Sequence, residues 1–298
     1  MLIVAKNVIN IYAKPDSNSE VTSQAILGDR LISCEQQASF TNVICEDKYR
    51  GWVDTRYLVD EHSNAQLNHH VTALFVGVRK DRSLSAELIT RLVISTKVKI
   101  EDSSKLEEFV KVYLPGGETG WSKSNDISMP LAIQNYANWG TDPAERAALI
   151  NMLGERVVAT AKRFIGVPYL WGGTTPFGID CSGLVQLCYK IEGVQLLRDT
   201  YLQSGDKRFI EVEQKKPFDK ASFEAGDIVV FGTENNHGTG DHNMHIGIAC
   251  GDGYFIHASG RERNFGVYID SCREPFYAER YMKALRLSAT AELSIESS

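Results

Sequence analysis

No part of this sequence is apolar over the roughly 18–20 residues that a membrane-spanning helix requires. Positive charge is not in excess either, because the 298-residue chain carries a net charge of −6 at pH 7, whereas nucleic-acid-binding proteins present a basic face. Its first residues, MLIVAKNVINIYAKPDS, contain no basic segment and no small-residue cleavage site. We therefore expect neither a membrane nor a nucleic acid as partner. If Met1 is the native start, we expect a cytoplasmic protein; otherwise a secreted protein is the alternative.

The six cysteines form no CxxC pair, a spacing typical of zinc and redox sites. A chain of this length can bury a core without disulfide support. Five of them are therefore expected to be small buried residues in a reducing compartment: Cys34, Cys45, Cys188, Cys250 and Cys272. Cys181 requires a separate interpretation, because it lies between an aspartate and a serine where a loop gives way to a helical pattern.

The first 130 residues contain a weak internal repeat. Phe40 precedes the pair Gly51-Trp52, and Phe109 precedes Gly120-Trp121 with the same spacing. Short alternating segments separated by turn residues accompany each copy, a pattern that predicts two small β-barrels. The alternative is that the copies are unrelated pieces of one all-β domain.

The motif order in the first copy is Leu27-Gly28-Asp29, a strand, Phe-x-x-Val, Gly-Trp-Val and a closing leucine. This order resembles bacterial SH3-like (SH3b) domains. The resemblance implies SH3-like barrels over residues 1–62 and, more weakly, over 68–130. Such domains often accompany cell-wall enzymes.

The second half predicts helices followed by strands. Asp142-Pro143 begins a helical pattern that Gly166-Val167-Pro168 ends, and Gly154 allows either one helix or two with a break. A second helix is expected from about Asp180, with Cys188 on its apolar face. Strands are predicted at 226–231, 245–249, 254–257 and 282–287. Helices before strands indicate an α+β domain.

Cys181 is expected in the first turn of the second helix, off the apolar stripe. Backbone N–H groups at a helix start stabilise a thiolate, so this position favours a reactive cysteine. A cysteine nucleophile needs a base and often a group that orients the base. His245 and His257 lie on consecutive predicted strands, and an antiparallel hairpin would bring them side by side. The alternative is that both are hydrogen-bonded core residues.

The segment HGTGDHNMH also contains enough ligands for a zinc ion: His237, Asp241, His242 and His245. Their spacing does not match a helical HxxxH pair, and the segment is rich in glycine. We favour a flexible active-site loop over a metal site.

The C-terminal half resembles the NlpC/P60 family of papain-like cysteine peptidases over residues 140–290. The resemblance rests on five segments in the same order: Tyr169-Leu170-Trp171-Gly172-Gly173, Asp180-Cys181-Ser182-Gly183, Gly226-Asp227-Ile228-Val229-Val230-Phe231, His245-Ile246-Gly247-Ile248 and Ile256-His257-Ala258. It implies that Cys181 is the nucleophile, His245 the general base and His257 the residue that orients the base. Tyr169 matches a tyrosine whose hydroxyl assists oxyanion binding, with loop packing as the alternative.

Family members cleave murein stem peptides between γ-D-glutamate and a diamino acid. The subgroup with SH3b domains includes YkfC-like recycling peptidases, which require a free N-terminal L-alanine. This resemblance implies that Asp180, Ser182 and Thr200 hold the substrate ammonium, although Asp180 could equally be a helix cap. In that subgroup the first SH3b domain adds an acid and a tyrosine, for which Asp29 and Tyr49 are the nearest matches.

The sequence thus predicts a papain-like α+β peptidase domain behind two SH3-like barrels, acting on L-Ala-γ-D-Glu-diamino acid peptides without a cofactor. The diamino acid is diaminopimelate or lysine. One alternative is a secreted endopeptidase acting on intact peptidoglycan. Others are a non-catalytic peptidoglycan-binding protein and a metal-dependent hydrolase. The long segment 233–243 departs from the family pattern and implies a remodelled substrate rim.

Overall fold

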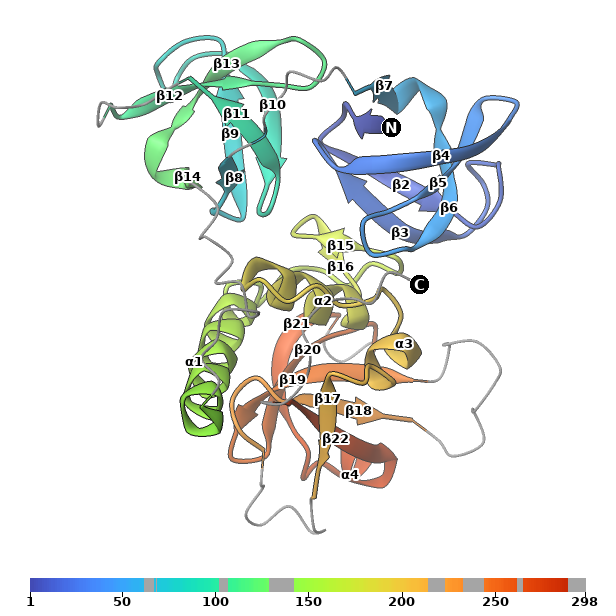
Figure 1. The fold of residues 1–298 in the computed structure, drawn as a ribbon, viewed down its shortest axis with the longest axis vertical. Helices are drawn as coiled ribbons and strands as arrows, with labels where there is room; N and C mark the ends of the chain where they lie inside the picture. Colours follow the sequence, from blue (N-terminus) through green and yellow to red (C-terminus); the bar gives the residue numbers. More distant parts are fainter. Residues whose placement is uncertain are drawn as a thin grey trace. The chain divides into compact units, whose positions relative to one another are not determined.

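The computed structural model describes residues 1–61, 67, 69–101, 107–128, 142–213, 223–232, 244–261 and 265–288 (Figure 1). The chain divides into two compact units. The first unit contains Met1–Ala132 and the short segment Trp171–Pro176, and the second contains Ile133–Leu170 and Phe177–Ser298. None of the helices in these described ranges is long and apolar enough to span a membrane.

Two antiparallel sheets make up most of the first unit (Figure 1). The strands of the first sheet are β1 (Leu2–Val4), β2 (Val8–Tyr12), β3 (Val21–Ile26), β4 (Arg30–Gln37), β5 (Phe40–Ile44), β6 (Arg50–Asp54) and β7 (Leu58–Asp60). The strands of the second sheet are β8 (His69–Val71), β9 (Phe75–Arg79), β10 (Leu88–Val93), β11 (Lys97–Ile100), β12 (Phe109–Tyr113), β13 (Thr119–Lys123) and β14 (Ile127–Ser128). One 3₁₀ turn precedes the last strand of each sheet, at Thr55–Tyr57 and Ser124–Asp126.

The two sheets have the same strand order. The first runs β3-β2-β6-β5-β4-β1-β7 and the second β10-β9-β13-β12-β11-β8-β14, so each strand has its counterpart in the same place. The register also matches, because Trp52 pairs with Asn42 and Trp121 pairs with Lys111. The repeated Phe-to-Trp spacing therefore corresponds to two hairpins, β5–β6 and β12–β13, that pair in the same register. A duplication predicts this equivalence.

A six-stranded antiparallel sheet forms the centre of the second unit. Its order is β17 (Phe209–Val212), β22 (Tyr281–Leu287), β18 (Ile228–Phe231), β19 (His245–Gly251), β20 (Tyr254–Ser259) and β21 (Gly266–Ser271). Four helices accompany it: α1 (Pro143–Lys162), α2 (Cys181–Ile191), α3 (Thr200–Ser204) and α4 (Pro275–Arg280). A short two-stranded ladder joins β15 (Thr174–Thr175) to β16 (Gly178–Ile179).

Helices α1 and α2 pack together against β19 and β20. On the sheet, Val229, Phe231, Ala249 and Phe255 form a buried cluster with Tyr277 of α4. The central strand β18 is buried along its whole length, and β20 is buried in all but its first residue. The expected α+β order is confirmed; β17 and β21 were not predicted from the sequence.

Helix α1 is continuous through Gly154, so the two-helix alternative is wrong. The Asp142 carboxylate accepts a hydrogen bond from the Ala144 amide at 2.9 Å, which is the predicted N-cap. At Gly154 the helix meets the Ala225–Gly226 turn so closely that a Cβ would lie 1.9 Å from the Ala225 carbonyl oxygen. The glycine is therefore a contact surface for that turn and not a helix break.

The expectation that five cysteines are buried is wrong for three of them. Cys188 and Cys272 are buried, Cys45 and Cys250 are half-buried, and Cys34 is exposed. The register of β4 against β5 shifts between Ser33 and Glu35, which leaves Cys34 at an irregularity on the solvent side. Alternation alone does not reveal such a bulge.

Replacing Gly154 by alanine is expected to lower the free energy of unfolding by about 1–3 kcal/mol, because the new methyl group overlaps backbone. Helix propensity alone predicts the opposite sign, a gain of roughly 0.5–1 kcal/mol. Urea denaturation measures the difference. Met152→Ala, at an exposed site of the same helix, is the control and should change stability by no more than about 0.5 kcal/mol. A Gly154→Ala protein as stable as the parent would contradict the close contact.

Candidate functional site

Cys181 is the first residue of α2, as the sequence predicts. Asp180 is its N-cap, and the Asp180 carboxylate accepts a hydrogen bond from the Gly183 amide at 2.7 Å. The half-buried Cys181 therefore lies at the end of the helix where backbone N–H groups are unpaired and the potential is positive. Cys188, on the apolar face of the same helix, is fully buried, and burial raises the pKa of its thiol.

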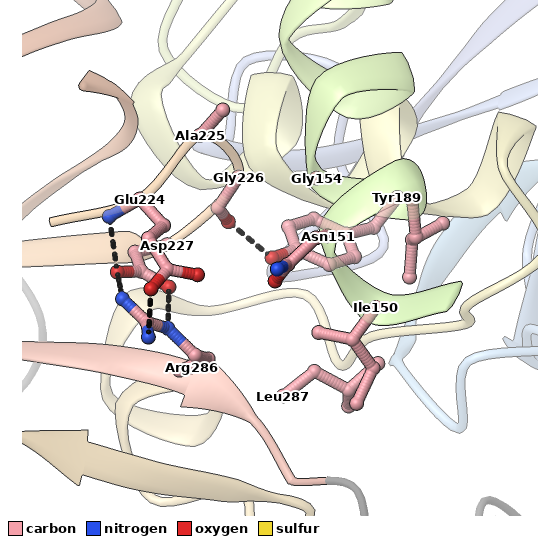
Figure 2. A pocket seen from close by; sticks show the side chains of 11 residues that line it. Ile150, Asn151, Gly154, Tyr189, Glu224, Ala225, Gly226, Asp227, Arg286 and Leu287 are labelled. Carbon is pink, nitrogen blue, oxygen red and sulfur yellow. Dashed lines mark hydrogen bonds and ion pairs between the residues drawn. The ribbon is translucent and has the colours of Figure 1, made fainter. Parts of the chain in front are cut away.

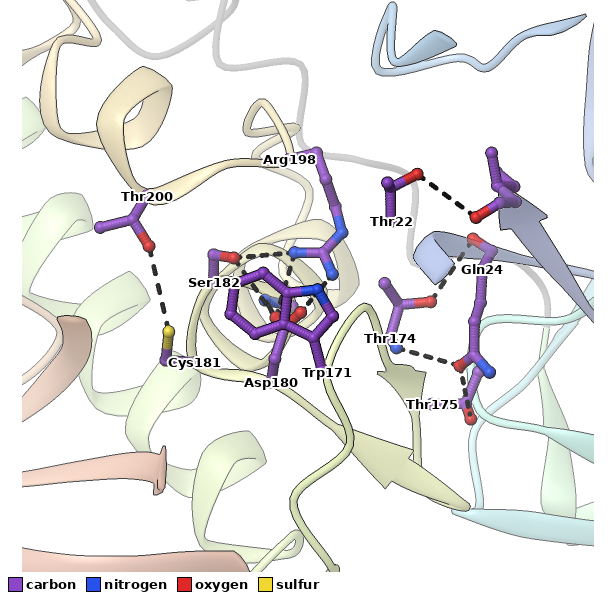
Figure 3. A network of polar contacts seen from close by, with 12 residues as sticks. Thr22, Gln24, Trp171, Thr174, Thr175, Asp180, Cys181, Ser182, Arg198 and Thr200 are labelled. Atoms are coloured by element: carbon purple, nitrogen blue, oxygen red, sulfur yellow. Dashed lines mark hydrogen bonds and ion pairs between the residues drawn. The ribbon is translucent and has the colours of Figure 1, made fainter. Parts of the chain in front are cut away.

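Arg198 joins the residues on either side of Cys181 (Figure 3). Its Nη1 donates to Asp180 Oδ1 at 3.0 Å and to Ser182 Oγ at 2.7 Å, and its Nη2 donates to Asp180 Oδ2 at 2.5 Å. Only 2% of the Arg198 side chain is exposed. Arg198 was not predicted from the sequence as a site residue, although it lies two residues before the candidate Thr200 in the segment Arg198-Asp199-Thr200-Tyr201.

Thr200 lies directly beside the cysteine. Its Oγ1 is 4.0 Å from Cys181 Sγ, which places a hydroxyl at the sulfur (Figure 3). On the same short helix, the Gln203 amide donates to the carbonyl oxygens of Ser182 and Leu197 at 3.0 and 2.9 Å. Four of the sequence-predicted site residues are therefore brought together here: Asp180, Cys181, Ser182 and Thr200.

His245 and His257 form a second cluster in the same unit. The predicted hairpin exists, since β19 and β20 pair antiparallel across a turn at Asp252-Gly253. His245 Nε2 and His257 Nδ1 are 2.6 Å apart, so one of the two nitrogens donates a hydrogen bond to the other. In the tautomer in which His245 Nε2 carries the proton and donates, His245 Nδ1 is unprotonated and can accept a proton.

An aromatic environment encloses His257, which is fully buried. The ring centroids of Phe255, Tyr268 and Tyr277 lie 4.6, 4.5 and 5.4 Å from that of His257. Its Nε2 has no hydrogen-bond partner within the part of the chain that the structure describes. With its ring fixed by packing and by one hydrogen bond, His257 holds the imidazole of His245 in place.

Both imidazoles are kept neutral at ordinary pH. Burial, together with the positive charge of Arg261, lowers the pKa of His245 to about 4. Burial, then the neighbouring His245 and Arg261, lowers the pKa of His257 well below its usual range. A neutral imidazole can accept a proton, so His245 has the protonation state that a base requires.

Tyr169 lies beside the strand that leads to the cysteine. It forms an isolated parallel bridge with Ile179, two residues before Cys181, and its ring makes an edge contact with Phe265 at 5.8 Å. A Cβ on Gly260 would lie 3.1 Å from the Tyr169 ring. Packing therefore fixes the position of the Tyr169 ring, as the loop-packing alternative predicts. The role of its hydroxyl in oxyanion binding stays a prediction.

Asp29 and Tyr49 belong to the first unit, whereas the other candidates that the structure describes belong to the second. The Asp29 carboxylate accepts a hydrogen bond from the Ile26 amide at 2.8 Å and closes a turn, and the Tyr49 amide donates to Asp47 Oδ1 at 3.0 Å. The Asp29 carboxylate thus has a structural role that the sequence comparison did not suggest. His237, Asp241 and His242 of the zinc interpretation lie outside the described residues, as does the segment 233–243.

The segment Trp171–Pro176 belongs to the first unit, although Tyr169 and Cys181 on either side of it belong to the second. Trp171 Nε1 donates to Glu20 Oε1 at 2.8 Å. The Thr174 amide donates to Gln24 Oε1 at 3.1 Å (Figure 3). Gly172 passes so close to β3 that a Cβ there would lie 2.4 Å from the Val21 carbonyl oxygen. No sequence pattern signals the roles of Glu20 and Gln24, because each partner lies some 150 residues away.

A pocket elsewhere in the second unit contains none of the candidates. It is lined by α1, by residues 224–227 and by Arg286 of β22 (Figure 2). Arg286 donates to both carboxylate oxygens of Asp227, at 2.8 and 2.7 Å, and to Glu224 at 2.7 Å. The charged groups that line this pocket, Arg286, Asp227 and Glu224, are paired with one another, so we assign them a structural role.

Comparison with known proteins identifies a family domain within the second unit. The family model described as NlpC/P60 matches residues 166–286, which include both the cysteine cluster and the histidine pair. Residues 166–286 are an NlpC/P60 family domain. The expected fold of this half is confirmed by a crystal structure of an NlpC/P60 family protein from Bacillus cereus, which superposes with a TM-score of 0.73 over 96% of this chain and 99% of that one, at 21% identity.

The similarity to two relatives extends beyond the domain. A γ-D-glutamyl-L-lysine dipeptidyl-peptidase of Bacillus cereus is 26% identical over 280 residues, covering 90% of this chain and 75% of the relative. Dipeptidyl-peptidase 6 of Lysinibacillus sphaericus is 25% identical over 265 residues, covering 86% and 87%. The murein DD-endopeptidase/murein LD-carboxypeptidase MepS of Escherichia coli is 37% identical over 123 residues, covering 41% of this chain and 56% of MepS.

The histidine pair should make stability depend on pH. In the unfolded chain a histidine takes up a proton below about pH 6.5, whereas folded His245 does so only near 4. The unfolded state therefore binds more protons between these values, and stability falls as pH drops from about 6.5 to 4, by up to about 1.4 kcal/mol per pH unit. Urea unfolding at several pH values should show a shallower dependence in His245→Gln. The same dependence in both proteins would contradict the lowered pKa of His245.

Proposed function

We propose that this chain is a cysteine peptidase that hydrolyses the γ-D-glutamyl–L-diamino acid bond of murein stem peptides in cell-wall peptide recycling. The observation that carries the proposal is the hydrogen-bonded pair His245–His257 in the same NlpC/P60 domain as a cysteine at a capped helix start. A pair of neutral imidazoles, of which His257 is fully buried and His245 half-buried, supplies both a base and its support.

In the proposed reaction Cys181 is the nucleophile, His245 the base and His257 the residue that orients it. The Cys181 thiol transfers its proton to His245 Nδ1, and Sγ bonds to the γ-carbonyl carbon of D-glutamate. The carbonyl oxygen becomes an oxyanion, for which the Tyr169 hydroxyl and backbone N–H groups are the donors. The C–N bond then breaks as the leaving amine takes the proton from His245, and a thioester remains.

Water completes the cycle. His245 accepts one proton from the water molecule, the resulting hydroxide adds to the thioester carbonyl, and the C–S bond breaks. The proton returns from His245 to Cys181 Sγ, so that the free acid leaves and the thiol is restored. No further reactant is required.

The proposed substrate carries a free N-terminal L-alanine. The relatives named γ-D-glutamyl-L-lysine dipeptidyl-peptidase support the release of a dipeptide. The hydroxyls of Ser182 and Thr200 and the carboxylate of Asp180 are the proposed acceptors for the substrate ammonium. Asp180 enters this role with its charge already paired to Arg198, so the ammonium would share it.

We also propose that residues 1–62 and 68–130 are SH3-like domains, with the peptidase domain at 140–290. The identical strand order of the two sheets supports the duplication. Asp29 and Tyr49 are the proposed contributions of the first domain to substrate binding. The Asp29 carboxylate also closes a turn by accepting a hydrogen bond from the Ile26 amide.

The decisive assay incubates the purified chain with L-Ala-γ-D-Glu-L-Lys and with the diaminopimelate tripeptide, and identifies the products by mass spectrometry. We expect release of L-Ala-γ-D-Glu. N-acetylation should lower kcat/KM about a hundredfold, because a charged hydrogen-bonding group is lost. Cys181→Ala should lower kcat by about a thousandfold or more, whereas Cys34→Ser, which changes an exposed thiol of the first unit, should not.

Each alternative has its own result in this assay. Activity that survives in Cys181→Ala, or that EDTA abolishes, would favour a metal-dependent hydrolase. Cleavage of cross-linked peptidoglycan in preference to the tripeptides would favour a wall endopeptidase, as the similarity to MepS allows. Equal cleavage of acetylated and free peptides would reject the free-amine requirement.

A further inference from the structure

Asp180 presents an electrostatic difficulty for a nucleophile at position 181. Its carboxylate is needed as the cap of α2, since it accepts the Gly183 amide at 2.7 Å. However, a negative charge on the preceding residue disfavours the thiolate form of a cysteine. The Asp180 side chain is only 8% exposed, so water and salt screen this repulsion poorly.

Arg198 provides the compensating charge. It binds both oxygens of the Asp180 carboxylate, at 3.0 and 2.5 Å, and its side chain is only 2% exposed. A bidentate arginine–carboxylate pair has a fixed geometry, and the guanidinium stays charged at all relevant pH values. The residue before the cysteine is therefore part of a neutral pair.

The same arginine also binds the other side of the cysteine. Its Nη1 donates to Ser182 Oγ at 2.7 Å, and Thr200, two residues further along, places Oγ1 4.0 Å from Cys181 Sγ. Gln203 anchors this segment through the carbonyl oxygens of Ser182, Leu197 and Arg198. Arg198 therefore binds the residues on both sides of Cys181 (Figure 3).

We propose that Arg198 is a positioning residue of the reaction: it cancels the charge of the helix-capping Asp180 so that the helix start can stabilise the Cys181 thiolate. The inference rests on the proposed function, since it concerns the same cysteine. It has a consequence for the substrate as well. With Asp180 neutralised, an incoming ammonium group meets a paired carboxylate and not an isolated one.

The test measures how readily Cys181 loses its proton, independently of peptidase activity. Iodoacetamide is added between pH 4 and 10, where the thiol loses its proton to solvent and the sulfur displaces iodide. Peptide mass spectrometry then reports the rate at Cys181, with the exposed Cys34 in the same sample as internal reference. The variants are Arg198→Met, Arg198→Lys, Asp180→Asn and the double variant Asp180→Asn/Arg198→Met.

The variants should move the midpoint of alkylation in opposite directions. Arg198→Met leaves the Asp180 carboxylate without its counter-ion. It should raise the midpoint of Cys181 alkylation by about one pH unit, with a roughly tenfold slower reaction at pH 7. Asp180→Asn keeps a good N-cap but removes the negative charge, so the midpoint should fall. The double variant should return close to the parent, and Arg198→Lys should lie between the parent and Arg198→Met.

Arg286→Met is the matched control. It breaks a bidentate pair with the buried Asp227 elsewhere in the same unit, and should lower stability without moving the Cys181 midpoint (Figure 2). Unchanged midpoints in folded Arg198→Met and Asp180→Asn would overturn the proposal. A matching shift in Arg286→Met would also overturn it, by assigning the effect to general loosening. If Arg198→Met does not fold, the direction of the Asp180→Asn shift and the recovery in the double variant decide.

Peptide hydrolysis by the same variants separates this proposal from the proposed function. If the parent chain cleaves the tripeptide, kcat/KM of Arg198→Met at pH 7 should fall about tenfold and recover at higher pH. If the parent cleaves none of the peptides, the proposed function fails, while the alkylation midpoints still decide the role of Arg198.

Discussion

The carboxylate of Asp180 is the group on which the arrangement of the second unit depends most directly. Its Oδ1 accepts a hydrogen bond from the Gly183 amide and so caps the N-terminus of α2. Both of its oxygens accept hydrogen bonds from Arg198. Breaking such a buried pair by removing one partner generally costs several kcal/mol, because it leaves an uncompensated charge. The cap, the ion pair and the orientation of Ser182 are therefore one cooperative feature, and Cys181 lies in the middle of it.

The histidine pair is surrounded mainly by apolar and aromatic groups. Within the described residues, the ring contacts of His257 are to aromatic side chains, and its hydrogen bond is to the imidazole of His245. A negatively charged support would raise the basicity of His245 and favour the imidazolium ion, whereas this environment favours the neutral base. The two clusters thus differ in what sets their charge: paired charges surround the cysteine, whereas burial, assisted by the positive charge of Arg261, keeps the histidines neutral.

Much of this could be predicted from the sequence where the determining interactions are local. Asp142 and Asp180 were identifiable as helix starts because a cap acts on residues two or three positions ahead. The histidine hairpin followed from strand spacing and a glycine-rich turn. The repeated Phe–Trp spacing corresponded to a hairpin register.

Features that depend on distant parts of the chain were missed or misjudged. The burial of Arg198 is set by tertiary packing, and a propensity pattern contains no information on it. Gly154 looked like a weak point of a helix because the turn that contacts it lies some seventy residues later. The exposure of Cys34 results from a bulge between two strands, which periodicity does not reveal.

The segment Trp171–Pro176 makes the local structure before Cys181 dependent on the N-terminal strands. The chain leaves the second unit at Leu170, lies along β3 of the first unit and re-enters the second at Phe177, shortly before the cysteine. Gln24 and Thr174 therefore share a hydrogen bond within the first unit, although they lie some 150 residues apart in the sequence. Replacing the N-terminal strands would remove the hydrogen-bond partners of Trp171 and Thr174, so the conformation of the segment that precedes Cys181 depends on residues at the other end of the chain.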